Sequence, residues 1–259
     1  MQKSVRRLFV WLVLVAFVFA SEAQAAAIVE SVTGDVKAGP STNNLSAVAK
    51  DQKLDAGVTI VTGPKSVAVL GFDDGQKMVL AENTEFRITG YSFHKDEPKK
   101  DHFAFALLKG ALRSITSLFT RRNPNAYALR IPQATIGIRG TDYMVALVNP
   151  AYLHVLGGNI GITTGAGFGS FGPPSYIQIL GPNALPVTLP AVQLPPNVAQ
   201  LFKQLAAFQI TPGAAGVNAA TIGAAGGPNP AWFIVPLVIG GALAGSGGGG
   251  GNNNTGTTK

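Results

Sequence analysis

The chain has 259 residues, of which 46% are hydrophobic and only 13% are charged, so it can bury a sizeable core but carries about half the charge usual for a soluble domain. It contains no cysteine, which excludes disulfide frameworks, cysteine-ligated metal sites and thiol catalysis. Glycine (32) and proline (17) are abundant, but they follow no Gly-X-Y period, which excludes collagen.

The N-terminus has the pattern of a secretory signal peptide. A basic start precedes an uninterrupted apolar run at 8–20, and Ala23-Gln24-Ala25 forms an A-x-A cleavage site. A retained signal anchor is the alternative, but this run is shorter than the ~20 residues that span a bilayer. We therefore expect residues 1–25 to be removed after Ala25, and the mature chain to be periplasmic or extracellular at the cell surface after Sec-type export.

Charge is distributed unevenly along the chain. The formal net charge is +7, and removal of residues 1–25 leaves 17 basic and 12 acidic residues. The basic residues form pairs rather than a stripe, so we expect a solvated surface and no nucleic-acid partner. After Asp142 the only charged residues are Lys203 and Lys259. This second part is apolar and rich in glycine, proline and amide residues, a composition expected of segments that are buried, surface-associated or loosely ordered.

The charged half predicts short strands separated by turn residues. Residues 85–89 alternate with period two, so Phe86 and Ile88 should face the core. Asp74-Gly75 is a turn signal, and Gly34-Asp35 is a second candidate. No helical period occurs among these segments, which favours an all-β sandwich, barrel or solenoid. The predicted strands lie within 28–36, 58–62, 66–72, 77–80, 85–89, 102–108, 126–131 and 134–148.

Two more strands are predicted after Asp142, followed by one helix. Residues 152–163 alternate around a Gly-Gly turn, and residues 175–180 alternate again. Residues 183–230 read as a Pro/Gly/Ala-rich linker that contains a helix at about 197–210. Asn197 is the candidate N-cap of this helix, and its apolar face should dock on another element.

The last residues are apolar and then glycine-rich. Residues 231–244 are apolar but short for a membrane span, so they could be a buried tail, an interfacial anchor or an assembly segment. The G-x-x-x-G at Gly241 to Gly245 is typical of helix dimers, although chance explains it better in a glycine-rich segment. Residues 245–259 have nothing to bury, and we expect them to be disordered.

Several segments between residue 28 and about residue 180 together match a family pattern. They are V-T-G-D-V at 32–36, K-L-D-A-G-V-T-I-V-T-G at 53–63, V-A-V-L-G-F-D-D-G-Q-K-M-V-L with its N-T-E-F-R-I extension at 67–88, L-L-K-G-A-L-R at 107–113 and I-P-Q-A-T-I-G-I-R-G-T-D-Y-M-V at 131–145. The most specific part is G-I-R-G-T at 137–141, within the last of these segments. On these segments the chain resembles the FecR domain, an exported bacterial module. The resemblance implies a β-solenoid-like or sandwich FecR module at 26–182 that acts by contacting other molecules.

The best-known members of this family are transmembrane regulators that control a sigma factor. Here only a short basic stretch precedes the apolar run, so we expect no cytoplasmic sigma-factor domain. The resemblance implies a non-enzymatic interaction module of the cell envelope that binds an envelope protein or polymer, with peripheral membrane contact or oligomerisation through 231–244 as possibilities. A periplasmic sensor in an iron-uptake or sigma-factor type pathway, acting with a separate membrane partner, is the alternative.

The FecR motif admits two interpretations. In the first, Arg139 is presented on a turn between Gly137 and Gly140 to bind an anion or acidic partner. In the second, which we favour, the glycines and Thr141 are structural. The glycines would then allow a tight turn or a close backbone approach, and Arg139 would satisfy buried carbonyls or pair with Asp142.

Other motifs favour no catalytic, cofactor or metal site. Gly167 to Gly172 match G-x-G-x-x-G, but Pro173-Pro174 follow where dinucleotide binding needs a helix. Asp73-Asp74-Gly75 lacks the further ligands of a calcium loop. The three histidines have no zinc-ligand spacing, and no G-x-S-x-G elbow occurs. A carboxylate pair could form only by tertiary proximity among Glu82, Glu85, Asp96 and Glu97.

Overall fold

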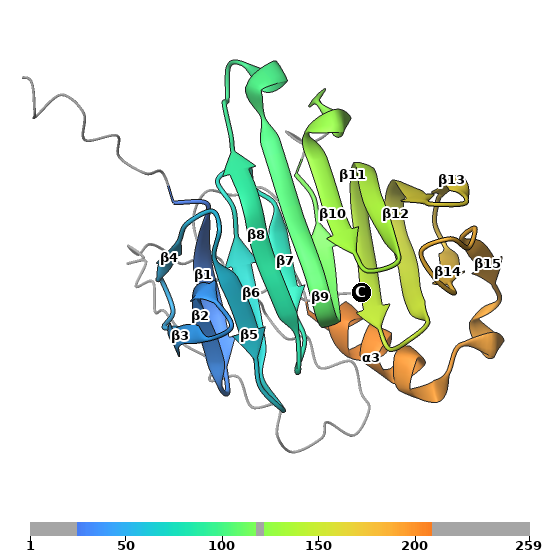
Figure 1. The fold of residues 1–259 in the computed structure, drawn as a ribbon, viewed down its shortest axis with the longest axis horizontal. Coiled ribbons are helices and arrows are strands. Elements are labelled where there is room, and N and C mark those ends of the chain that lie inside the picture. The colour runs from blue at the N-terminus through green and yellow to red at the C-terminus, as the bar shows by residue number, and fades with distance from the viewer. Residues whose placement is uncertain (1–24, 118–121, 209–259) are drawn as a thin grey trace, which may run out of the picture. The chain divides into compact units, whose positions relative to one another are not determined.

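The computed structural model describes residues 25–117 and 122–208, which are built almost entirely from β-strands (Figure 1). The strands are β1 (Ala27–Thr33), β2 (Val36–Ser41), β3 (Asn44–Ala47), β4 (Lys53–Leu54), β5 (Thr59–Thr62), β6 (Val67–Gly71), β7 (Lys77–Leu80), β8 (Glu85–Ser92), β9 (His102–Ile115), β10 (Tyr127–Ile131), β11 (Ala134–Leu147), β12 (Ala151–Thr164), β13 (Gly167–Phe171), β14 (Ser175–Ile179) and β15 (Val187–Leu189). The helices are η2 (Pro98–Lys100), η3 (Pro124–Ala126), η4 (Ala191–Gln193) and α3 (Pro196–Ala206).

All fifteen strands are hydrogen-bonded into one sheet, and the sheet is folded into two layers. The first layer has the strand order β3-β2-β5-β8-β9-β10-β11-β12-β13, and the second has the order β4-β1-β6-β7-β9-β11-β12-β14-β15. Strands β9, β11 and β12 occur in both lists, because each runs through one layer and continues into the other. Chain order roughly follows the length of the sheet, as the blue-to-orange colour sequence of Figure 1 shows.

The register shows where the three long strands change layer. The first half of β9 pairs with β8 and β10, while its second half, from Gly110 onward, pairs with β7 and β11. Strand β11 pairs with β10 before Arg139 and with the second half of β9 from Asp142, and its register with β12 is interrupted between those two residues. Strand β12 pairs with β14 up to Val155 and with β13 from Ile160. Strands that switch layers in this way join the two faces of a sandwich.

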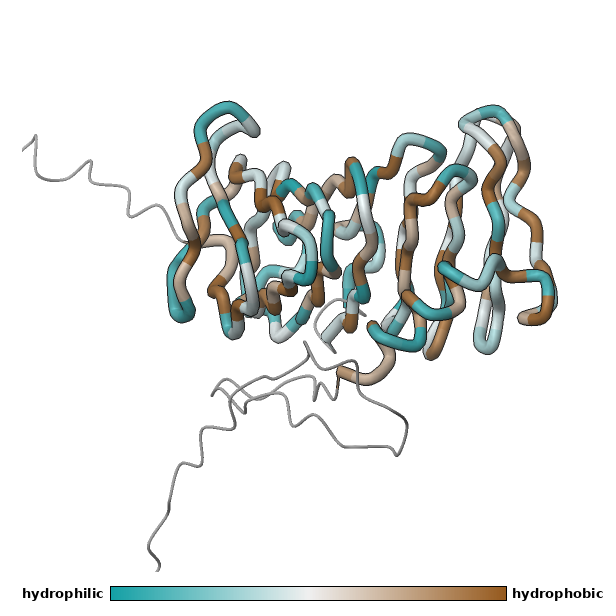
Figure 2. Tube along the Cα trace, turned by 90° about the horizontal axis from the view of Figure 1, so that it is seen from below, coloured by the Kyte–Doolittle hydropathy of each residue, from teal (hydrophilic) through white to brown (hydrophobic). Residues whose placement is uncertain are grey.

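A single hydrophobic core fills the space between the layers. Its largest fully buried side chains include Phe86 of β8, Phe103 and Phe105 in the first half of β9, and Tyr143 in the second half of β11. The ring of Phe72, at the end of β6, lies 5.3 Å from that of Phe105 on β9 and so joins the two layers. Along the strands, hydrophobic and hydrophilic positions are interspersed (Figure 2), as expected when one face of each layer is covered.

Helix α3 packs on the outer side of the second layer, against β9 and β11. Its buried face consists of Val198, Phe202 and Leu205, which repeat at helical spacing. On the sheet, Met144 and Ala146 point outward and are nevertheless buried at 1% and 0% exposure. The helix therefore gives part of the sandwich a second, smaller apolar layer outside the core.

The all-β fold with one short helix is confirmed, and each predicted strand corresponds to an observed one. Phe86 and Ile88 are both fully buried, as their period predicted. Strands β3, β4 and β13 were not predicted, and β9 extends to Ile115 instead of ending at residue 108. Two further details were wrong. The Gly157-Gly158 pair is no turn, because β12 runs through it as one strand. Asn197 is not the N-cap of α3, because Pro195 takes that position and Pro196 is the first helical residue.

The segment expected to be an extended linker contributes to the sheet. Within it, β15 pairs with β14, and η4 leads into α3. Short apolar stretches between prolines carry little strand signal by themselves, so this edge strand was missed. Residues 1–24, with the expected signal peptide and Ala23 of its cleavage site, lie outside the described residues, as do the apolar segment 231–244 and the tail 245–259. Ala25 is the first described residue.

Candidate functional site

The G-I-R-G-T residues lie where β11 passes from the first layer to the second. Gly140 has a φ of +61° at this corner, and Gly158 of β12 has a φ of +72° beside it. A Cβ atom on Gly158 would lie 2.0 Å from the carbonyl oxygen of Gly140, so the two backbones are in direct contact. Gly137, by contrast, has free space around it, because a Cβ atom there would meet nothing closer than the carbonyl oxygen of Gly161 at 4.0 Å. Gly140 therefore has a backbone role that Gly137 does not share.

Thr141 completes this corner through its backbone. Its N–H donates to the Oγ1 of Thr116 at 2.7 Å, and its carbonyl oxygen accepts bonds from the Thr116 N–H and Oγ1 at 2.9 and 3.0 Å. The backbone of Thr141 is buried at a point where the β11–β12 ladder is interrupted, so Thr116 supplies the missing partners. Arg139 is exposed, and Asp142 forms its ion pair with a different cation than the predicted Arg139.

That cation is Arg113, on the outer face of β9. Its Nε and Nη2 donate to the two carboxylate oxygens of Asp142 at 2.9 and 2.7 Å, which is a bidentate pair. Its Nη1 donates to the carbonyl oxygens of Leu205 and Phe208 at 3.2 and 2.8 Å. Carbonyls in the last turn of a helix have no partners within the helix, so Arg113 caps α3 and connects it to the corner of β11.

The opposite edge of the sandwich is a stack of corners built in the same way. Here Gly110 has a φ of +84°, and a Cβ on it would lie 2.5 Å from the Cα of Thr84. The Thr84 hydroxyl bonds both the N–H and the carbonyl oxygen of Ala111 at 3.0 Å. The Thr62 hydroxyl likewise bonds the Thr84 N–H at 2.9 Å. Hydrogen bonds that join each corner to the next, among them Gly63 N–H to Asp35 O and Asn83 N–H to Gly63 O, continue the stack.

The predicted turn at Asp74-Gly75 is a tight turn between β6 and β7. Gly75 has a φ of +83°, and its N–H donates to the Phe72 carbonyl oxygen at 2.8 Å. Asp74 is fully buried, and its carboxylate accepts hydrogen bonds from the Gln76 N–H and from the hydroxyls of Tyr91 and Ser117. Burial, and secondarily the Asp74 charge, raises the pKa of Tyr91. This carboxylate thus ties the turn to β8.

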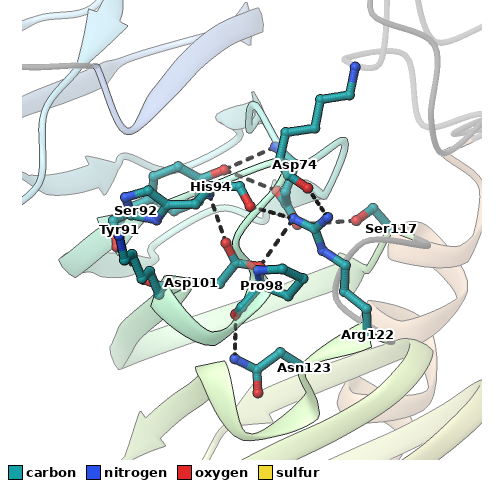
Figure 3. A network of polar contacts seen from close by, with 11 residues as sticks. Asp74, Tyr91, Ser92, His94, Pro98, Asp101, Ser117, Arg122 and Asn123 are labelled. Carbon is teal, nitrogen blue, oxygen red and sulfur yellow. Dashed lines mark hydrogen bonds and ion pairs between the residues drawn. The ribbon is translucent and has the colours of Figure 1, made fainter.

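A neighbouring cluster ties down the loop between β8 and β9 (Figure 3). Arg122 donates to the carbonyl oxygens of Lys95 and His94, and it pairs with the buried carboxylate of Asp101 at 3.4 Å. The same carboxylate accepts the His94 N–H at 2.7 Å. Since Arg122 engages backbone carbonyls and an internal carboxylate, it stabilises this loop.

A third polar group lies inside the core. The hydroxyls of Tyr127 and Tyr143 are 2.6 Å apart, and Ser114 Oγ is 3.5 Å from the Tyr127 hydroxyl. Burial is the main cause that raises the pKa of Tyr127 to about 12, and it also raises the pKa of Tyr143. Both phenols therefore remain neutral over the physiological range.

The remaining candidate residues are dispersed. In the described part of the chain no group of three or more histidine, aspartate or glutamate side chains is placed to hold a metal ion. Glu82 holds the Lys65 N–H at 2.6 Å, and Glu97 pairs with Lys100 at 2.8 Å, so these carboxylates belong to different sites. Gly167 and Gly169 of the G-x-G-x-x-G segment lie in β13, where they leave room for Leu185 and for Phe171 with Pro186.

The structure does form a surface groove, which sequence patterns did not indicate. It has a volume of about 400 Å³ and lies between α3, the turn before β8, the Gly110 corner and the turn after β11. Four amide side chains and three large aliphatic side chains line it. The amides are Asn83, Asn197, Gln200 and Gln204; the aliphatic residues are Leu147, Val148 and Leu201; Glu82 and Lys109 complete the charged part of the lining.

The groove was missed because its walls come from segments that are far apart in sequence. Each amide offers two donors and an acceptor, so the lining suits a ligand with alternating donor and acceptor groups. The volume falls within the usual range for ligand pockets.

Among the residues that the structure covers, no helix is long and apolar enough to cross a membrane.

Comparison with known proteins places these features in a family. Two crystal structures of a "putative anti-sigma factor" from Parabacteroides distasonis resemble this chain, with 15% and 13% sequence identity and TM-scores of 0.42 and 0.41. Each match covers 51% of this chain and 58% of the other. No curated protein matches the sequence. Residues 58–161, which include the corners at Gly110, Gly140 and Gly158, match the family model described as FecR protein, and this part of the chain is a FecR domain.

Proposed function

We propose that this protein is an exported binding module of the bacterial cell envelope, and that it acts by contacting a protein partner rather than by catalysis. The observation that carries the proposal is the groove beside α3. Most of the residues that line it lie within the FecR match at 58–161. The remaining ones belong to α3, which follows the match in sequence. The FecR resemblance supports a regulatory rather than an enzymatic role.

The lining of the groove favours a protein ligand. Asparagine and glutamine side chains can pair with peptide groups through one donor and one acceptor each. The aliphatic lining residues Leu147, Val148 and Leu201 suit an apolar side chain of the same ligand. Arg113 fixes the C-terminal end of α3, and packing of Phe202 fixes its buried face, so the wall of the groove is held in place before a partner arrives.

Site-specific cross-linking tests this assignment in the native organism. A photo-reactive residue at Gln200, inside the groove, should capture an envelope protein as a discrete product. The matched control is Gln193, an exposed glutamine of η4 outside the groove lining, where we expect no such product. Equal capture from both positions would show that the groove is not the contact site, and no capture from Gln200 or Gln204 would contradict the proposal.

A second candidate function is sensing within a cell-surface signalling pathway, with a separate membrane partner that carries the signal onward. The match to the FecR model favours it, because the best-known members of that family are regulators. Deletion of the gene should then abolish a transcriptional response to the inducing condition, and a response that survives deletion would remove this candidate. The periplasmic or cell-surface location belongs to both proposals and rests on the signal-peptide pattern of residues 1–25.

A further inference from the structure

The outer edge of β13 differs from the edges of the second layer. Among the described residues, β13 pairs with β12 alone, so a row of its backbone N–H and C=O groups faces away from the sheet. The edge strands of the second layer are too short to pair readily with another chain, because β4 has two residues and β15 has three. Prolines also stand on both sides of β15. Strand β13 has five residues, with no proline and no charge within it.

One large apolar side chain of this edge strand, Phe168, is exposed. Phe168 has 67% of its surface exposed and lies over Gly161 of β12, where a Cβ atom would come within 2.8 Å of its ring. Behind the strand, Leu185 and Pro186 approach Gly167 and Gly169 and close the end of the sandwich. An incoming chain therefore cannot enter the core easily, but it can pair with the edge itself.

Charge determines which partners this edge can accept. Between Tyr143 and Phe208 the only charged residue is Lys203, so the edge offers no ion-pair partner and no repulsion. Charges on an edge strand are a usual protection against self-pairing, and β13 has none. A second uncharged, apolar edge is the best match to such a surface, and every other copy of this chain provides one.

The residue pattern of β13 also suits pairing with itself. Strand β13 reads G-F-G-S-F, and its central residue is the small Gly169. In an antiparallel pair with a two-fold axis at Gly169, Phe168 of each copy lies opposite Ser170 of the other. The two Phe168 rings are then diagonal neighbours on one face, within reach of each other. A two-fold contact of this kind uses the same surface of both copies and closes after two.

We propose that the exposed edge of β13 pairs antiparallel with β13 of a second copy, which makes the protein a symmetric dimer centred on Gly169. The contact joins two first layers into one continuous sheet and covers the Phe168 rings. It leaves α3 and the groove outside the contact, so it goes beyond the proposed function, and either can fail while the other holds.

Sedimentation velocity over a concentration series of the purified protein tests the dimer. The wild-type protein should pass from monomer to dimer, and Phe168→Lys should weaken association by about tenfold or more, because it places two cations together at the axis. The control Val192→Lys adds the same charge on η4, at a residue that is 89% exposed, and should dimerise like the wild type. A wild type that is monomeric throughout, or a loss that is equal in the two variants, would overturn the proposal.

Cysteine cross-linking tests the register, since the natural chain has no cysteine. Residues directly opposite each other in an antiparallel pair are close enough for a disulfide, whereas diagonal neighbours at about 7–8 Å are too far apart. A mixture of Phe168→Cys and Ser170→Cys copies should therefore form mixed disulfides faster than either variant forms them with itself. Cross-linking that is no faster in the mixture would contradict the two-fold axis at Gly169.

Discussion

Gly158 and Gly137 of the FecR domain test whether the corner of β11 and β12 requires glycine. The backbone at Gly158 requires it, whereas the backbone at Gly137 does not. Gly158→Ala should lower the free energy of unfolding by about 2 kcal/mol or more, since it combines a strained positive φ with a clash against the Gly140 carbonyl oxygen. Gly137→Ala should change it little or raise it slightly, because space is available there and alanine restricts the unfolded chain. Urea unfolding of both variants measures the difference, and equal losses would show that the corner is not responsible.

The buried tyrosine pair makes the fold sensitive to alkaline pH. The pKa of Tyr127 is raised to about 12 by burial, whereas in the unfolded chain it is near 10. The stabilisation is complete below pH 10 and is lost as the pH rises from about 10 to 12, by about 2 to 3 kcal/mol in total. Unfolding curves across this range should show a smaller alkaline loss in Tyr127→Phe than in the wild type. An unchanged alkaline loss would exclude this phenol as its source.

At the level of elements, α3 depends on Arg113. Arg113→Ala leaves Asp142 without its cation and the last carbonyls of α3 without their cap, so we expect a loss of about 2 to 3 kcal/mol. Arg113→Lys keeps the charge but cannot form the two-pronged pair, so it should recover only part of the loss. Amide hydrogen exchange should show early loss of protection in α3 while β9 remains protected. Unchanged protection of α3 would contradict this role.

The same helix should respond to acid through His154. This side chain of β12 is 9% exposed, stacks on Tyr176 at 3.9 Å, and lies 5.9 Å from the Phe202 ring of α3. Burial lowers its pKa, an effect that the Asp142 charge partly opposes. Its contribution to stability is therefore present above its usual pKa near 6.5 and is lost as the pH falls below that value. His154→Phe should remove this acid-dependent loss, as measured by exchange protection of α3 at pH 7 and pH 5; an equal loss in the variant would assign it elsewhere.

The elements show what the sequence could predict and what it could not. Period-two alternation was sufficient for strands such as β8, because Phe86 and Ile88 respond only to burial on one face. It could not reveal that β9, β11 and β12 change layer within one strand, because a corner needs only one glycine and a hydroxyl group supplied by another turn. The ion-pair partner of Asp142 could not be predicted from the sequence either. Arg113 is 29 residues away in the chain, and only the register of β9 with β11 brings the two together.

At the level of the whole molecule, the break in charge along the sequence becomes a gradient in space. Chain order follows the length of the sheet, so the charged residues before Asp142 gather toward one end and the uncharged β13–β15 strands form the other (Figure 1). Composition alone could not distinguish a loosely ordered second half from a folded one. The difference is made by β12, which contributes to both layers and carries the core beyond Val155.

The central claim is that the protein is exported and binds a protein partner in the cell envelope. Fractionation of the native host tests this claim most directly. We expect the protein in the envelope fraction, with a mature N-terminus at Ala26 by mass spectrometry and with a partner cross-linked through the groove beside α3. Full-length protein that still carries Met1 in the cytosol, with no envelope partner, would contradict the claim.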